Sequence, residues 1–366
     1  MAEADRVYVV VGGMAYEGWL QSEVSRSIEA IAATFSIPVT LIPGAPPAIK
    51  RQDLVQVRVG GVVVVTGYVL AAEPFYRKGD CGVRIVGRDR TGDLVRSSAI
   101  HQGGQWRQVG LERIAGDLVK PFGLTVATEA DVGGPIADFK LEHGESVLDA
   151  LSRAARMRGV LVTRNSAGNL VLTKAGQRRF PGVIRRGSNV IAMDGVGSDD
   201  GRHSHYIVYG QANVVTDFET ARSLKAQARD DGMRRYLPLV INADGNTTAA
   251  ELQALAEHTA RVRRGHSQGF RYLVEGWTVG GQPWPVNERV AIFDDVAGLD
   301  GHEWLICSVR QTCDRREGAA TELVVRPIEA YDSVPLKTRV IRRHWGNRGN
   351  TTNHPRGPRD GALGGE

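Results

Sequence analysis

Residues 141–176 have the sequence LEHGESVLDALSRAARMRGVLVTRNSAGNLVLTKAG, which predicts a helix followed by a β-hairpin. Ser146 stands directly before apolar residues that recur at helical spacing, where an N-cap is needed, and Gly159 stands where such a helix ends. Two apolar runs, 160–163 and 170–173, flank a polar turn that contains glycine, as in a hairpin. We expect the helix and the hairpin to pack through five leucines, Leu148 and Leu151 against Leu161, Leu170 and Leu172. None of these side chains is chemically reactive, so the unit is predicted to be a scaffold.

The chain of 366 residues is long enough for about two to four domains. Hydrophobic residues make up 42% and charged residues 24%, and 44 glycines favour many turns and short strands over a helical bundle. No apolar run approaches the roughly 20 residues that cross a bilayer, and the first residues lack the features of a signal peptide. We therefore expect a protein that is made in a cytoplasm and stays there unless lysis releases it.

The net charge of +5 is concentrated at the C-terminus. Residues 337–366 hold seven Lys or Arg residues against two acidic ones, which leaves the rest of the chain close to neutral. A basic body that grips nucleic acid is therefore poorly supported. The tail itself lacks an apolar period and is expected to be extended or disordered in isolation.

Short strands dominate residues 1–96, where apolar residues run together or alternate between glycine-containing turns. The segment 22–39 fits either a helix or a strand that ends at Pro38, and a strand is favoured because both neighbours are strands. Five or six short antiparallel strands in about ninety residues are typical of a small barrel or sandwich. The expected strands are 6–11, one near 16–20, 54–59, 62–70 and 82–87, with turns at Gly12-Gly13 and Gly60-Gly61.

An α/β region and a second β-rich region follow. Helical periodicity predicts helices at 111–122 and 147–158, separated by a short strand near 124–127. The second β-rich region begins near Val183 and contains one long helix, 248–264. Its expected strands are 204–210, 270–277, 289–293, 304–310 and 321–327.

Residues 265–269, GHSQG, match the G-x-S-x-G nucleophile elbow of α/β-hydrolases and make Ser267 a candidate nucleophile. In that elbow the serine lies on a turn from a strand into a helix. Here the order is reversed, because the predicted helix 248–264 comes before the serine and the strand 270–277 comes after it. A helix C-cap at Gly265 and a loop into the next strand therefore explain the motif better than catalysis does.

Histidine and acidic residues give weak metal-site patterns. His302-Glu303 begins like H-E-x-x-H, but Ile306 stands in place of the second histidine. His203 and His205 are expected on the same side of a strand, which leaves metal binding open. A cluster of aspartates lacks the alternation and the final glutamate of a calcium-binding EF-hand; it comprises Asp294, Asp295 and Asp300.

Three cysteines, Cys81, Cys307 and Cys313, have neither metal-site nor disulfide spacing, and their odd number argues against a disulfide framework. Buried reduced thiols are expected. We expect no catalytic, cofactor-binding or metal-binding residue in the chain.

Many short matches to one family run along the chain in order. The first half contributes Trp19, Arg26-Ser27-Ile28-Glu29, Phe35, Gly87-Arg88-Asp89-Arg90-Thr91, Asp93-Leu94-Val95 and Ser98-Ala99. The second half contributes Gly144-Glu145-Ser146-Val147, Ala150-Leu151, Ala155-Arg156, Gly168-Asn169-Leu170-Val171-Leu172, Tyr206-Ile207-Val208, Gly210-Gln211, Gly276-Trp277, Trp284 and Pro285-Val286-Asn287. Their order and spacing resemble the baseplate hub proteins of Mu-like contractile-tailed phages, whose counterpart in T-even phages has the same general plan. The resemblance covers nearly all of residues 6–331, and the tail after Pro335 lies outside it.

The resemblance implies an α+β, mainly β fold with two tail-tube-like antiparallel β-barrel domains and an inserted small α/β domain, assembling as a trimeric ring. Three copies of two similar barrels make a pseudo-sixfold ring, which suits a sixfold tail tube on one side and a threefold central spike on the other. The corresponding domains are 1–96 for the first barrel, 97–180 for the α/β domain, 181–336 for the second barrel with a further small subdomain near 211–240, and 337–366 for the basic tail.

The implied function is that of a structural baseplate hub without a catalytic step. Its expected partners are two further copies of itself, the central spike protein, the tail tube or a distal tube-initiator protein, baseplate wedge proteins and the tape measure protein. DNA is expected only in transit through the pore, and no membrane insertion is expected. Such a protein is assembled in the host bacterial cytoplasm and becomes part of the virion.

Three alternatives stay open. One is the equivalent hub of a phage-derived bacteriocin or of another contractile injection system. Another is a hydrolase that uses Ser267, such as a tail-associated cell-wall or lipid esterase. The third is a nucleic-acid binder that acts through Arg339, Arg342, Arg343, Arg348, Arg356 and Arg359 of the tail. For that tail we favour ordering against a partner protein, anchored by His344 and Trp345.

Overall fold

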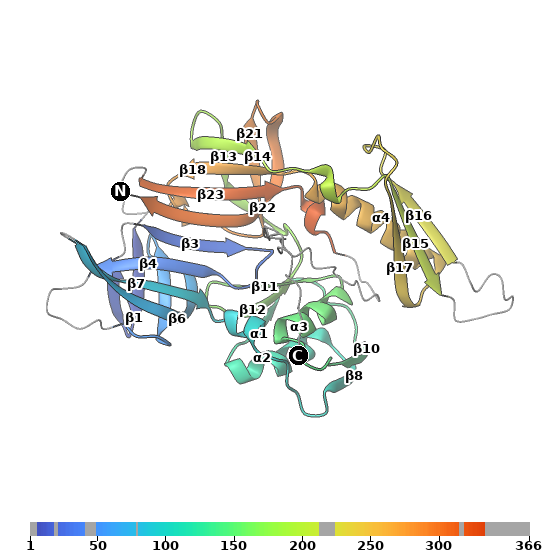
Figure 1. The fold of residues 1–366 in the computed structure, drawn as a ribbon, viewed down its shortest axis with the longest axis horizontal. Coiled ribbons are helices and arrows are strands. Elements are labelled where there is room, and N and C mark those ends of the chain that lie inside the picture. The colour runs from blue at the N-terminus through green and yellow to red at the C-terminus, as the bar shows by residue number, and fades with distance from the viewer. Residues whose placement is uncertain are drawn as a thin grey trace, which may run out of the picture.

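The computed structural model describes residues 6–17, 21–40, 49–77, 80–211, 224–314 and 318–333. Strands predominate, and the helices form two groups, one below the main sheet and one beside a small outer sheet (Figure 1). The mainly β character predicted from the sequence is confirmed. Within the described ranges, no helix combines the length and the apolar character that crossing a membrane requires.

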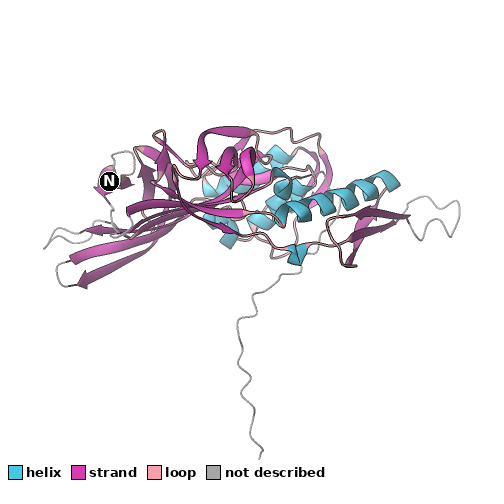
Figure 2. Cartoon of the chain, turned by 90° about the horizontal axis from the view of Figure 1, so that it is seen from above, coloured by secondary structure: helices cyan, strands magenta, loops and turns pink. Residues whose placement is uncertain are grey.

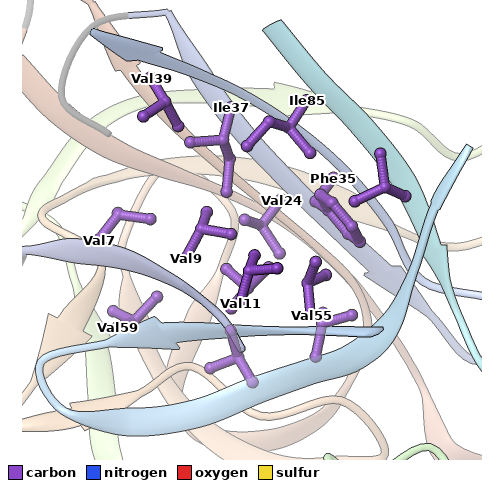
Figure 3. Packing of buried hydrophobic residues seen from close by; sticks show 14 of the residues in the cluster. Val7, Val9, Val11, Val24, Phe35, Ile37, Val39, Val55, Val59 and Ile85 are labelled. Atoms are coloured by element: carbon purple, nitrogen blue, oxygen red, sulfur yellow. The ribbon is translucent and has the colours of Figure 1, made fainter. Parts of the chain in front are cut away.

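The first β-rich part is a sheet that curls around one apolar core. Valines alternate with less buried residues in its first strand, so Val7, Val9 and Val11 all face inward. Figure 3 shows them meeting Phe35 and Ile85 of other strands in a closely packed interior. The strands are β1 (Val7–Val11), β2 (Met14–Glu17), β3 (Ser22–Ser27), β4 (Thr34–Thr40), β5 (Leu54–Val59), β6 (Val62–Arg77) and β7 (Asp80–Asp89).

The ambiguous segment 22–39 forms strand, as favoured, but it forms two strands rather than one. Ser27 Oγ accepts a hydrogen bond from Glu29 N at 3.1 Å, and this local bond begins a turn that ends the first strand. The second strand runs past Pro38 to Thr40. Positive φ values confirm the turns predicted at Gly12-Gly13 and Gly60-Gly61.

A small α/β unit follows, built around a second core. Both predicted helices are present, and the first one ends in a short 3₁₀ turn, η2 (Lys120–Phe122). Three of its elements, α1, β8 and β10, are absent from the sequence-based prediction. The elements are α1 (Gly92–Arg96), β8 (Gln105–Val109), α2 (Leu111–Val119), β9 (Val126–Thr128), β10 (Ile136–Lys140), α3 (Val147–Arg156), β11 (Leu161–Arg164) and β12 (Leu170–Thr173).

The helix and hairpin of residues 141–176 form as predicted. Ser146 Oγ accepts a hydrogen bond from the N–H of the third helical residue at 3.1 Å and so caps α3, and Gly159 has a φ of 62° just beyond its end. The packing differs at one strand. Val160 and Val162 of the hairpin join the core instead of Leu161, because the opposite face of β11 turns towards α3.

The second β-rich part surrounds a third core that contains the fully buried side chains of Tyr272 and Trp284. Its strand pairs are antiparallel except for β13 and β21, which run parallel. A small two-stranded ribbon, β19 and β20, lies beside it. The strands are β13 (Arg178–Arg185), β14 (Val190–Gly195), β18 (Phe270–Glu275), β19 (Thr278–Val279), β20 (Gln282–Pro283), β21 (Glu288–Asp294), β22 (Leu299–Asp314) and β23 (Gly318–Arg326).

An outer three-stranded sheet packs on the longest helix and has a small core of its own. Figure 2 shows this helix lying beside the sheet at one end of the molecule. Thr248 forms a capping box with Glu251 and so begins the helix, as its position before the apolar period predicts. The predicted subdomain near 211–240 falls partly here, but residues 212–223 lie outside the described ranges. The elements are η3 (Asp199–Gly201), β15 (His205–Gln211), β16 (Leu224–Arg229), β17 (Pro238–Asn246), α4 (Ala249–His266) and η5 (Ile328–Tyr331).

Hydrogen bonding joins the two β-rich parts into one 13-stranded sheet. The joining strand is β22, which pairs with β21 through its first half and with β3 through its second half. The order is β14-β18-β23-β22-β3-β4-β7-β6-β5-β1-β2, with β21 and β13 branching from β22. One edge of β22 therefore pairs with strands of both parts. The described strands contain no closed barrel. The prediction of two antiparallel barrels is corrected to two curled, open sheets that share this strand.

The two curled sheets repeat one arrangement. Strands β3, β4, β5, β6 and β7 have the same chain order and the same neighbours as β14, β18, β21, β22 and β23. The long strands β6 and β22 are each 16 residues long, and each has a register shift at its ninth residue, Leu70 in β6 and Cys307 in β22. We call two residues at the same place in this repeat counterparts.

The repeat extends to unusual backbone geometry. Gln52 and Asn287 both have positive φ, 75° and 67°, although neither is glycine. Each donates its N–H to the carbonyl oxygen just before the bulge of the neighbouring long strand, Gln52 to Val69 at 2.7 Å and Asn287 to Ile306 at 2.9 Å. Two identical local solutions in one chain support a true structural duplication.

Candidate functional site

The two curled sheets meet where β22 pairs with β3, and a buried polar cluster lies at this joint. Gln311 is fully buried; its Nε2 donates to the carbonyl oxygen of Trp277 at 2.9 Å, and its Oε1 accepts from Arg26 Nη2 at 3.1 Å. Trp277 Nε1 in turn donates to the carbonyl oxygen of Thr312 at 2.7 Å. These bonds satisfy polar atoms that the joint removes from water.

Trp277 also joins the halves by packing. It follows β18 of the second sheet, yet its fully buried side chain belongs to the apolar core of the first sheet, together with Cys313 of β22. The first core is therefore completed by residues from the far end of the chain.

Arg26 brings a positive charge into the joint. Its Nη2 also donates to the carbonyl oxygen of Trp284 at 2.8 Å, while its Nε has no hydrogen-bond partner among the described residues. Burial, together with the nearby charge of Arg164, lowers the pKa of Arg26 to about 9. Both of these hydrogen bonds go from the guanidinium to neutral acceptors.

Asp89 connects the first sheet to the α/β unit. Its carboxylate accepts from Ala33 N at 3.0 Å and from Thr91 Oγ1 at 2.6 Å, and it forms an ion pair with Arg164 of β11. The side chains of Asp89 and Arg164 are 0% and 8% exposed, so this is a buried salt bridge. Burial lowers the pKa of Arg164, and the charge of Asp89 opposes that effect.

Gly87, two residues earlier, lets β7 lie close to its neighbours. A Cβ at this position would come within 2.2 Å of the Phe35 ring and 2.4 Å of the Tyr68 carbonyl oxygen. The segment Gly87-Arg88-Asp89-Arg90-Thr91 is thus a structural connector between two cores.

A cavity of about 410 Å³ opens beside Arg26, where the two sheets and the α/β unit meet. Arg164 and Arg178 line it as further cations, and Glu129 and Glu288 line it as anions. Arg178 forms an ion pair with Glu129 at 2.7 Å. The lining therefore carries charges of both signs, three cations against two anions, and Arg178 and Glu129 neutralise each other.

Helix α4 precedes Ser267, as predicted from the reversed helix–strand order, but the C-cap is Ser267 and not Gly265, because the helix continues to His266. Ser267 Oγ donates to the carbonyl oxygen of Arg264 at 2.8 Å, which is an ordinary helix-end bond. The glycines of GHSQG have packing roles, since a Cβ on Gly265 would come within 2.4 Å of Ala330 N and a Cβ on Gly269 within 3.1 Å of neighbouring side chains. The motif is a close contact between α4 and η5.

We expect Ser267→Ala to leave any hydrolytic background unchanged and to lower stability only slightly, because one solvent-accessible hydrogen bond is lost. A fluorophosphonate probe should label the wild-type chain no more than the variant, as seen by gel fluorescence. Labelling that is strong in the wild type and absent in the variant would contradict this expectation and revive the hydrolase alternative.

The other chemical candidates are also held in structural contacts. Asp294 accepts from Tyr272 Oη at 3.1 Å and from Val296 N at 2.9 Å, and Asp295 pairs with Arg186 at 2.8 Å. These bonds order the loop between β21 and β22. Glu303 forms ion pairs with Arg179 and Arg289. The neighbouring His302 accepts a hydrogen bond at Nδ1 from Asp300 N. Ile306 lies in the third core.

His203 and His205 make separate contacts with neighbouring side chains. The ring of His203 contacts Tyr206 edge-on, and burial lowers the pKa of this histidine. His205 Nδ1 lies 2.9 Å from Ser204 Oγ, and its ring contacts Tyr236. Over the described ranges, no three His, Cys, Asp or Glu side chains gather as a metal site requires.

The cysteine prediction is correct at two positions and wrong at the third. Cys307 and Cys313 are buried free thiols, and burial raises the pKa of Cys307 to about 12. Cys81 is exposed, because it lies near the tip of the β6–β7 hairpin, beyond the core.

Sequence reasoning singled out Arg26, Asp89 and Trp277 as family-like positions but gave them no role. Gln311 gave no signal at all, since a lone glutamine in a strand is ordinary at the surface. The unsuspected feature is the strand pairing that buries it. Trp19 and the tail residues 337–366 lie outside the described ranges.

Two family models match the chain. Residues 6–89 match the Mu phage baseplate assembly protein GpP-like N-terminal domain, and residues 91–174 match the second domain of baseplate hub protein gp44-like proteins. The boundary between the two matches falls within the connector that contains Asp89.

Whole-chain comparisons agree with these matches. The baseplate hub protein gp44 of Escherichia phage Mu is 32% identical over 346 residues, which are 92% of this chain and 91% of that protein. The 43 kDa tail protein of prophage MuSo2 from Shewanella oneidensis is 31% identical, with a TM-score of 0.79 over 90% of this chain and 100% of that one. A tail protein from Neisseria meningitidis MC58, at 22% identity and a TM-score of 0.75, shares the fold over 89% of this chain and 98% of its own. The chain belongs to the family of phage baseplate hub proteins that includes gp44 of phage Mu.

Proposed function

We propose that the chain is a structural hub that acts as a homotrimeric ring, without a catalytic step. The ring adapts a sixfold tail tube to a threefold central spike and leaves a pore through which the genome passes. The observation that carries this proposal is the duplication of one curled sheet within the chain. Relatives that are baseplate hub and tail proteins support it.

The duplication explains how one protein meets two symmetries. Three copies present six similar sheets, so one face of the ring matches six identical tube subunits. The two sheets of a chain differ in detail, for example in the parallel pair β13–β21, so the same ring keeps true threefold symmetry for a spike. No chemical reaction is needed for this adaptation.

The proposed division keeps the four expected parts: a first sheet domain, an α/β domain, a second sheet domain that carries the outer sheet near 211–240, and a tail (337–366). The expected bounds 1–96 and 97–180 shift slightly, because Leu94 of α1 packs in the α/β core and Phe180 of β13 packs in the core of the second sheet. Helix α1 is therefore assigned to the α/β domain and β13 to the second sheet domain. The four separate apolar cores support the first three parts and the outer sheet. The proposed partners are the spike, the tube or its distal initiator, wedge proteins and the tape measure protein. Assembly in the host cytoplasm precedes incorporation in a virion or in a phage-derived particle.

Light scattering on a sizing column tests the trimer directly. We expect a mass near three times 39.7 kDa, because a ring of curled sheets buries large permanent interfaces. Negative-stain images of the same fraction should show a ring with six similar lobes. A chain that remains monomeric both alone and with its spike protein would overturn the proposal.

A further inference from the structure

Half of β6 has a free edge. β7 pairs with β6 along its whole outer length, to Arg77, whereas β5 pairs with it only as far as Tyr68. On the side away from β7, residues 71–76 have no strand partner in the described part of the chain. Among the described strands, β14 is the terminal strand of the sheet, with β18 as its one neighbour.

The repeat shows what such edges bind within one chain. The counterpart of β6 is β22, and residues 308–313 of β22 pair antiparallel with β3. The counterpart of β3 is β14. In the second sheet, the outer half of β22 thus pairs with β3, the edge strand of the first sheet. The corresponding half of β6 and the corresponding edge of β14 have no such partner among the described strands.

We propose that residues 71–76 of β6 pair antiparallel with β14 of the next copy of the chain, so that the joint within each subunit recurs between subunits. This rests on the proposed trimeric ring and specifies its interface. Three copies then contain six like joints, alternately within and between chains, and six equal rotations close the ring. Pairing at strand edges supplies main-chain hydrogen bonds.

The register follows from the counterparts. Phe75 and Thr312 are both the fourteenth residue of a long strand. Val324 of β23 and Val86 of β7 are counterparts, because each lies opposite the first residue after the bulge of its long strand. Arg271 pairs with Val324 and Ser36 pairs with Val86, so these two residues are counterparts as well. Asp194 lies opposite Arg271 and Glu23 lies opposite Ser36, which makes Asp194 and Glu23 counterparts. Thr312 lies directly opposite Glu23 in the joint within the chain. Phe75 therefore lies opposite Asp194 of the neighbouring subunit.

Exposure of the counterparts supports this assignment. Leu70 and Tyr76 of β6 are 40% and 89% exposed, whereas their counterparts Cys307 and Cys313 are 2% and 7% exposed. Ile191 on β14 is 52% exposed. Apolar side chains thus lie exposed at both free edges. At the counterpart positions of β22, the joint within the chain buries the side chains.

Two features make the joint between chains weaker than the joint within a chain. Pro74 has no N–H, so one edge hydrogen bond is lost. Glu73 lies diagonally across from Asp194, although each carboxylate also lies opposite an arginine of its own sheet, Arg84 and Arg271. Subunits therefore separate before the two sheets of one chain do.

A disulfide tests the register. In a Cys81→Ser background, Phe75→Cys and Asp194→Cys are combined, because directly opposite residues of an antiparallel pair are close enough to form a disulfide. Within one chain these positions are seven strand spacings apart along the sheet, so an intramolecular bond cannot form. After mild oxidation, non-reducing electrophoresis should shift the band from 39.7 kDa towards three times that mass, and reductant should reverse the shift.

Two further pairs control the result. Thr312→Cys with Glu23→Cys reproduces the joint within the chain and should form a disulfide without any gain in mass. Phe75→Cys with Ala192→Cys is out of register by two residues and should not cross-link. A trimer by light scattering in which the in-register pair stays reduced overturns this interface but leaves the proposed hub intact. A chain that remains monomeric by light scattering both alone and with its spike protein overturns both.

Discussion

Asp89→Ala should lower the free energy of unfolding by about 3–5 kcal/mol, the usual cost of removing one partner from a buried ion pair. The variant leaves the Arg164 guanidinium buried without its carboxylate, and it removes the acceptor of the Ala33 and Thr91 bonds. Urea denaturation followed by tryptophan fluorescence gives the midpoint. Because the chain has several cores, the relevant change is in the transition that reports the first sheet and the α/β unit.

The matched control is Asp295→Ala. Asp295 also pairs with an arginine, Arg186, but its side chain is 78% exposed. Solvent and salt screen such a pair, so the midpoint should stay where it is in the wild type. Equal midpoints for the two variants would mean that the buried pair contributes no more than a surface pair does.

Trp277→Ala should be of similar severity, about 3–5 kcal/mol, because it removes a large side chain from a closed core. Trp277 is fully buried in the first core although it follows a strand of the second sheet. The loss should therefore loosen the two sheets from each other as well as open a cavity. Limited proteolysis should cut the variant between the sheets at protease concentrations that leave the wild type intact.

Trp277→Phe separates packing from hydrogen bonding. Phenylalanine keeps most of the apolar volume but cannot donate to the Thr312 carbonyl, so a cost of about 1–3 kcal/mol is expected. Trp284→Ala should destabilise the second sheet instead, since Trp284 packs in the third core against Phe180. Proteolysis that opens the joint equally in the Trp277 and Trp284 variants would contradict the role assigned to Trp277.

Local features were predictable from the sequence because their causes are local. The cap at Ser146, the turn at Gly60-Gly61 and the helix before Ser267 depend on residues within one or two turns of chain. The absence of a nucleophile elbow followed from the same logic. Helix α1 was missed since five residues are too few to show a period.

The joint between the sheets was not predictable in this way. The pairing of β22 with β3 joins segments some 285 residues apart, and the sequence of neither strand identifies the other as its partner. Gln311 looks like a surface residue until that pairing buries it. The family resemblance supplied the idea of two like domains, but the shared strand and the continuous sheet required the structure.

The distance between β3 and β22 has a consequence during synthesis. At about 5–20 residues per second, roughly 15–60 s pass between the appearance of β3 and of the strand that covers its edge. Throughout that time the nascent chain presents an uncovered strand edge and a core that lacks Trp277. A ribosome-bound fragment ending before β22 is therefore the species most exposed to aggregation, and the last quarter of the translated message decides whether the first quarter becomes a finished domain.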